Sequence, residues 1–92
     1  MIVGKVLGSI VSTRKMNTLV GSKLMVVEPL SSMDNQHSKI IAIDNIGAGI
    51  GEIVLVATGS AARIGSHMAE SPIDAALVGI VDEEIGLKGA NL

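Results

Sequence analysis

Runs of aliphatic residues recur from one end of the chain to the other, and each is bounded by Gly, Pro, Ser or Asn. Val and Ile are frequent in these runs, and β-branched side chains favour strands. Most runs are apolar at consecutive positions, as in KIIAI and EIVLVAT, which indicates burial on both faces. Five strands are predicted, over Met1–Thr13, Lys23–Glu28, Lys39–Asp44, Glu52–Thr58 and Ala75–Asp82.

Only one segment has the character of a helix, GSAARIG at residues 59–65. Ser60 can cap it, Ala61 and Ala62 are good helix formers, and Gly65 can end it. The connections are short and rich in turn residues, so residues 1–92 are predicted to form one domain. The expected fold class is all-β: a small five-stranded barrel of the oligonucleotide-binding (OB) type with one short helix, partly open at an edge.

The composition points to assembly. A chain of 92 residues is short for a self-sufficient core, and it contains no Phe, Tyr, Trp or Cys. Hydrophobic residues nevertheless make up 48% of it, so we expect some apolar surface to be buried between subunits. A ring of identical chains would also cover an open barrel edge. The C-terminal EEIGLKGANL has little pattern and is expected to fray or to lie across a neighbouring subunit.

Charge and hydropathy exclude several classes of partner. The net charge is −2 and the seven Lys and Arg residues are scattered, which disfavours nucleic acid as a partner. No stretch reaches the ~20 apolar residues of a membrane helix, and Lys5 interrupts an N-terminal run that lacks signal-peptide features. A cytoplasmic protein without a membrane partner is expected.

The string GAGIGE, residues 47–52, is the most conspicuous motif. Its glycines superficially resemble a nucleotide-binding loop, but a predicted strand follows where a helix is required, and Glu52 stands where the third glycine would fall. The simpler interpretation is a tight strand connection in which glycine permits positive φ and close backbone approach. Such a loop would also suit identical backbones that converge on a symmetry axis.

The second motif is GSAAR, residues 59–63. It could bind an anion at a helix N-terminus with Arg63 as a partner, but an ordinary helix start is favoured. In that interpretation Arg63 pairs with a carboxylate such as Asp44, Glu52 or Asp74.

The remaining polar residues predict no catalytic, cofactor or metal site. His37 and His67 lie far apart in polar segments, and the acids 82–84 are typical of a solvated edge. A small enzyme that uses Glu52, His37 or His67 as acid or base remains the weaker alternative, because no pocket or orienting group accompanies them.

Taken in order along the chain, four segments resemble the EutN/CcmL family of bacterial microcompartment shell vertex proteins. They are GKVLGSIVSTRK, GSKLMVVEPL, IAIDNIGAGIGEIVLVATGSAAR and SPIDAALVGIVDEE. The resemblance implies a structural protein, not an enzyme, that forms homopentamers. These would cap the vertices of a carboxysome or metabolosome shell, beside its hexameric tiles. An OB-like nucleic-acid-binding module is the alternative function, although the stacking aromatics and basic groove of such modules are missing.

The resemblance also suggests site residues. Those expected at the central axis, pore or subunit boundary are Gly47, Ala48, Gly49, Gly51, Glu52, Ser60 and Arg63. Ala61 departs from the family pattern, which commonly has a serine there. We further hypothesise that Glu52 is held by Arg63, within one subunit or between two.

Overall fold

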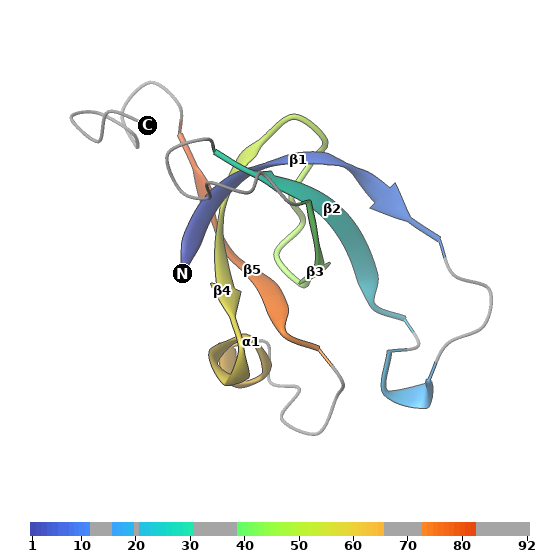
Figure 1. Ribbon diagram of the computed structural model, residues 1–92. Helices are drawn as coiled ribbons and strands as arrows, with labels where there is room; N and C mark the ends of the chain where they lie inside the picture. The colour runs from blue at the N-terminus through green and yellow to red at the C-terminus, as the bar shows by residue number, and fades with distance from the viewer. Residues whose placement is uncertain (12–15, 20, 31–38, 66–72, 83–92) are drawn as a thin grey trace.

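The computed structural model describes residues 1–11, 16–19, 21–30, 39–65 and 73–82 (Figure 1). Its last four strands lie within one residue of the predicted ones, whereas the first ends at Ile10 and leaves Val11 outside the strand that was predicted to run to Thr13. The five strands are β1 (Ile2–Ile10), β2 (Lys23–Pro29), β3 (Ile40–Asp44), β4 (Ile53–Thr58) and β5 (Ala75–Val81). A 3₁₀ turn, η1 (Asn17–Leu19), precedes β2, and the helix α1 (Ser60–Gly65) follows β4.

The strands form a closed barrel in the order β1-β2-β3-β5-β4, with β4 pairing back to β1. All neighbouring pairs are antiparallel except β3 and β5, which run parallel. That parallel contact pairs only Ile43 with Ala76 and Asp44 with Leu77. The expectation of a partly open barrel is therefore wrong, because this short β3–β5 seam closes the sheet.

Closure explains why the strands are apolar at consecutive positions. The inward side chains form one cluster, made of Val6, Met25, Val27, Ala42, Ala48, Val54, Val56, Ala75 and Leu77. A second cluster, made of Ile43, Ala62, Ile73 and Ala76, joins residues of β3 and β5 to α1. Because side chains alternate along a strand, neighbours such as Ala75 and Ala76 serve different clusters. The prediction of strands buried on both faces is therefore confirmed for β3 and β5, each of which contributes residues to both clusters.

The helix ends at Gly65 as expected, whereas its start differs from the prediction. Ser60 is already the first helical residue, and Gly59, at φ +65°, precedes it. The amide of Gly59 donates to the carbonyl of Asp74 at 2.7 Å, which ties the start of α1 to the start of β5. Among the residues that the structure describes, no helix is long and apolar enough to cross a membrane.

Candidate subunit-interface site

The loop between β3 and β4 is organised by the carboxylate of Asp44, the last residue of β3. One oxygen accepts hydrogen bonds from the amides of Ile46 (2.9 Å) and Gly47 (3.0 Å), and the other from the amide of Ala48 (2.9 Å). The Asp44 side chain is fully buried. A buried carboxylate with three amide donors is well satisfied, so it holds the three consecutive loop residues Ile46, Gly47 and Ala48 in one conformation.

Lys23, the first residue of β2, supports the same loop. Its Nζ lies 3.8 Å from Asp44 Oδ2 and donates to the carbonyl of Ala48 at 3.4 Å. The side chain of Ala48 belongs to the cluster inside the barrel, and this residue is 1% exposed. The loop is thus fixed by a carboxylate at its start and by a methyl group in the core.

The glycines of the loop divide into two kinds. Gly47 and Gly51 have φ of +82° and +90°, conformations that side chains disfavour, which confirms the expectation of positive φ in this connection. Gly49 has no such backbone requirement. A Cβ at Gly49 would instead lie 3.0 Å from Glu52 Oε1, the atom that accepts a hydrogen bond from the Gly49 amide.

The end of the loop continues the pairing of β4 with β1. The amide of Gly51 donates to the carbonyl of Val6 at 2.8 Å, and the amide of Val6 donates to the carbonyl of Glu52 at 2.9 Å. β4 follows directly, so the strand predicted after the motif is confirmed, and with it the argument against a dinucleotide-binding loop.

Two apolar side chains of this loop face outward. Ile46 is 43% exposed and Ile50 is 68% exposed. Neither was among the residues selected from the sequence, although both stand beside the glycines in DNIGAGIGE. Asp44 was considered only as a partner for Arg63. The side chain of an Asp that directly precedes a turn can accept hydrogen bonds from amides two to four residues later. The position of Asp44 before the glycine-rich segment could therefore have indicated that it binds the loop amides.

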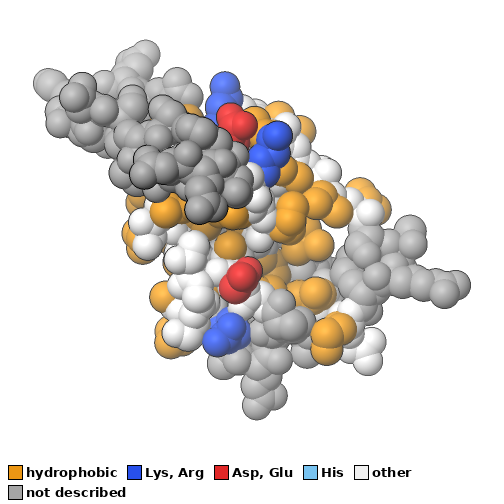
Figure 2. Space-filling model, in the orientation of Figure 1, with side chains coloured by type: hydrophobic (Ala, Val, Ile, Leu, Met, Phe, Trp, Pro, Cys, Tyr) orange, Lys and Arg blue, Asp and Glu red, His pale blue; other side chains and the backbone are white. Residues whose placement is uncertain are grey.

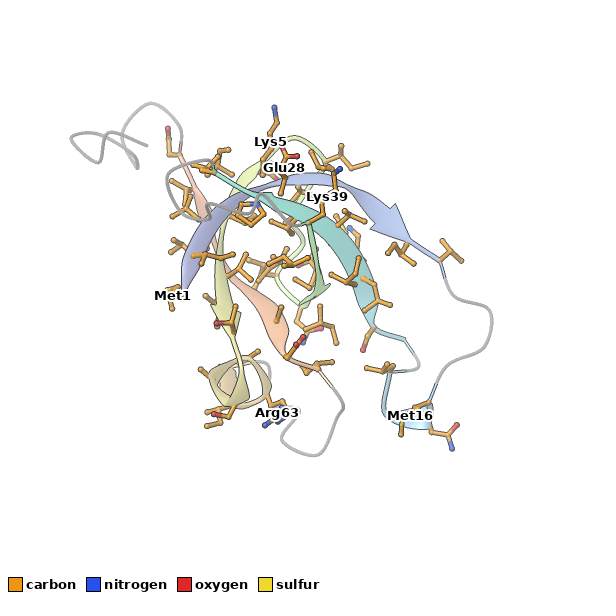
Figure 3. The ribbon with its side chains drawn as sticks, viewed as in Figure 1. Met1, Lys5, Met16, Glu28, Lys39 and Arg63 are labelled. Carbon is orange, nitrogen blue, oxygen red and sulfur yellow. The ribbon has the colours of Figure 1, made fainter. Side chains whose placement is uncertain are left out.

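The second motif lies at the other end of β4. Arg63 is in α1, where its Nη1 donates to the carbonyl of Ile73 at 3.0 Å, and Figure 3 shows it beside the helix. Ser60 is exposed at the start of the same helix. Glu52 stands immediately before β4, whose six residues span roughly 20 Å. A pair between Glu52 and Arg63 within one subunit is therefore excluded by the barrel, and only the pair between subunits remains a prediction.

The other polar candidates do not form a site in the described part of the chain. No group of three His, Cys, Asp or Glu side chains there could hold a metal ion. Asp82 is exposed after β5, while His37, His67, Glu83 and Glu84 lie outside the described residues.

Comparison with known proteins identifies relatives along nearly the whole chain. The family model described as ethanolamine utilisation protein EutN/carboxysome matches residues 1–82. The shell vertex protein GrpN of Rhodospirillum rubrum is 48% identical over 83 residues, which cover 89% of this chain and 93% of GrpN.

Two solved structures agree with this assignment. A structure of GrpN, described as a pentameric microcompartment shell protein, superposes with a TM-score of 0.76 at 48% identity, covering 89% of this chain and 94% of that chain. CcmL of Nostoc sp. PCC 7120 superposes with a TM-score of 0.79 at 39% identity, covering 89% of each chain.

Proposed function

The chain belongs to the EutN/CcmL family, and we propose that it is a structural subunit of a bacterial microcompartment shell. In this proposal it forms homopentamers that cap the vertices and close the polyhedral shell. The observation that carries the proposal is the near full-length similarity to proteins named shell vertex proteins, one of which is described as pentameric. The OB-like barrel alone would not decide between this role and nucleic-acid binding, because one fold serves many functions.

The surface of the single subunit supports assembly. Several large apolar side chains remain exposed, among them Val11 (89%), Ile64 (70%) and Ile50 (68%). Figure 2 shows hydrophobic side chains over much of the visible face of the described residues. An extensive apolar surface of this kind marks contacts with other proteins. Each subunit of a ring has two neighbours, so a ring would bury apolar surface on two sides of every subunit.

A ring of five subunits fits the geometry of a closed polyhedral shell. A cyclic ring repeats one head-to-tail contact between two different patches until rotation closes it. A sheet of hexagonal tiles needs five-fold positions in order to close. The proposed partners are therefore further copies of this chain and the hexameric tiles of the shell.

We further propose that the chain is not an enzyme and does not bind nucleic acid. Among the described basic side chains, Lys23 contacts Asp44 and Arg63 contacts Ile73, while Lys5 stands opposite Glu28 in the β1–β2 pair and Lys39 is exposed just before β3. Figure 3 shows Lys5 and Arg63 toward different ends of the barrel. Such a distribution provides no continuous basic groove for a phosphate backbone.

The molar mass in solution tests the proposed ring. Light scattering coupled to size-exclusion chromatography should give five times the 9.4 kDa chain mass, constant over a range of protein concentrations. A monomer at every concentration would contradict the proposed function, and a stable ring of another size would contradict the pentamer.

A further inference from the structure

Two strongly exposed isoleucines flank β4. Ile50, in the loop before this strand, is 68% exposed, and Ile64, in the helix α1 after it, is 70% exposed. Figure 1 shows the loop and α1 at opposite ends of β4, which spans roughly 20 Å. The two side chains therefore cannot contact each other within one subunit. Because burial of an isoleucine side chain is favourable, each of them marks a surface suited to contact with another protein.

Hydrogen bonds on both sides of Ile50 fix its position in the loop. The amide of Gly51 donates to the carbonyl of Val6 at 2.8 Å, and the amide of Gly49 donates to the carboxylate of Glu52. All of these partners belong to one subunit, so the loop has this conformation before any assembly. A side chain that is presented in this way loses little conformational entropy when it binds.

Opposite charges stand beside Ile50. Glu52 is exposed two residues later. Lys5 is also exposed, and it pairs across β1 and β4 with Ile53, the residue after Glu52. Glu28 of β2 stands on the other side of Lys5, away from the loop. We call Lys5, Ile50 and Glu52 the loop patch, which combines an apolar side chain with one acid and one base.

Opposite charges also accompany Ile64. The preceding residue is Arg63, whose Nη1 donates to the carbonyl of Ile73 at 3.0 Å, and Asp74, which follows Ile73, is exposed. We call Arg63, Ile64 and Asp74 the helix patch. It combines the same kinds of side chain as the loop patch. Across a contact between the two patches each acid can therefore face a base, which favours this pairing over contacts between like charges.

We propose that the loop patch of one subunit packs against the helix patch of the next, with the two isoleucines in contact and each acid opposite a base. The patches differ and lie at opposite ends of β4, as the head-to-tail contact of a cyclic ring requires. The inference rests on the proposed function, since the partner is a second copy of this chain. It adds an apolar contact to the hypothesis that Glu52 pairs with Arg63 between subunits, and it names the two surfaces that meet.

Charges placed at the two isoleucines test the contact. Ile50→Asp and Ile64→Lys should each raise the concentration at which half of the rings dissociate by roughly tenfold or more, because each puts a charge into a buried apolar contact. The double variant should recover part of the loss, since the new carboxylate then faces the new ammonium group. Ile50→Asp with Met16→Lys is the matched control and should recover nothing, because Met16 is 61% exposed but lies before η1, outside both patches. Single variants that dissociate like the parent protein, a double variant without recovery, or equal recovery in the control would overturn the contact.

A disulfide identifies the two patches directly, because the chain has no cysteine of its own. The masses of the parent chain and of the variant Ile50→Cys with Ile64→Cys are measured by light scattering. The variant is then oxidised and run on a non-reducing gel beside the two single-cysteine variants. We expect the mass of a ring for both proteins and a ladder of covalently joined subunits for the double variant alone.

The outcomes separate this contact from the ring itself. A parent ring with a double variant that stays monomeric on the gel overturns the contact and leaves the ring intact. Covalent dimers of a single-cysteine variant would show that like patches meet, which also overturns it. A monomeric parent chain in solution contradicts the proposed function, and with it the contact between neighbours.

Discussion

At the scale of single residues, Asp44 is the side chain on which the β3–β4 loop depends most. Its carboxylate accepts from three amides, while its ion pair with Lys23 involves a lysine side chain that is 54% exposed. An ion pair open to solvent contributes little, whereas buried amides without an acceptor are costly. The hydrogen bonds to the loop backbone are therefore the main contribution of this residue.

Replacing Asp44 tests that assignment. Asp44→Ala should lower the free energy of unfolding by about 1–3 kcal/mol, because the buried amide of Ala48 loses its acceptor, whereas the part-buried amides of Ile46 and Gly47 can bond to water instead. Asp44→Asn keeps one amide oxygen as acceptor and should lose less. Urea denaturation at fixed subunit concentration measures both, since assembly itself contributes to stability. Asp74→Ala, at an exposed carboxylate, serves as the control, and an Asp44→Ala variant as stable as this control would contradict the role.

At the scale of elements, β4 separates the two glycine-containing motifs. The loop 45–52 leads into one end of this strand, and α1 leaves the other. The hydrogen bond from Arg63 to Ile73 and that from Gly59 to Asp74 both tie α1 to the segment that begins β5. The two motifs are close in sequence, but the rigid strand places them at opposite ends of the barrel.

Because Glu52 and Arg63 lie at opposite ends of β4, they could pair only across a contact between two subunits. The hypothesis that they pair can therefore be tested on the stability of the ring. If the two side chains pair, they do so between neighbours, and a double-mutant cycle on ring dissociation should show a coupling of about 0.5 kcal/mol or more. Glu52→Gln and Arg63→Lys are suitable single variants, because the first removes the charge and the second removes the planar guanidinium. Additive effects on dissociation would remove the pair from the interface.

At the scale of the whole molecule, the barrel and the ring make different demands on the loop glycines. Gly47 and Gly51 are required by the backbone of a single subunit, since both have positive φ. Gly49 has no such requirement, and the atom that a new Cβ would approach is the end of the flexible Glu52 side chain. The proposal that Gly49 lies at a subunit boundary would account for its small size, because a side chain there would obstruct a close approach of neighbouring subunits.

We therefore expect Gly49→Val to fold as a barrel but to fail in ring closure. Circular dichroism should retain the strand signal, while light scattering should give a mass below five subunits. Gly8→Val is a control within a strand, because a Cβ at Gly8 would meet no atom within 4 Å in the isolated subunit. A Gly49→Val variant that forms the normal ring would show that this loop does not lie in a crowded interface.

Much of the architecture could be predicted from the sequence. The limits of β2 to β5 agree with the predicted strands to within one residue at each end, because runs of aliphatic residues and the glycines between them are local signals. The end of α1 at Gly65 was predicted for the same reason. The family resemblance added the ring, which no local pattern could have specified.

The strands, their burial on two faces and the family of the chain could all be recognised from the order and type of neighbouring residues. Three features needed the folded structure: a two-residue parallel seam closes the barrel, the Asp44 carboxylate binds loop amides and does not pair with Arg63, and Glu52 and Arg63 lie at opposite ends of β4. These outcomes depend on which strands become neighbours and in which register. Pairing of that kind joins residues far apart along the chain and leaves no local pattern from which it could be predicted.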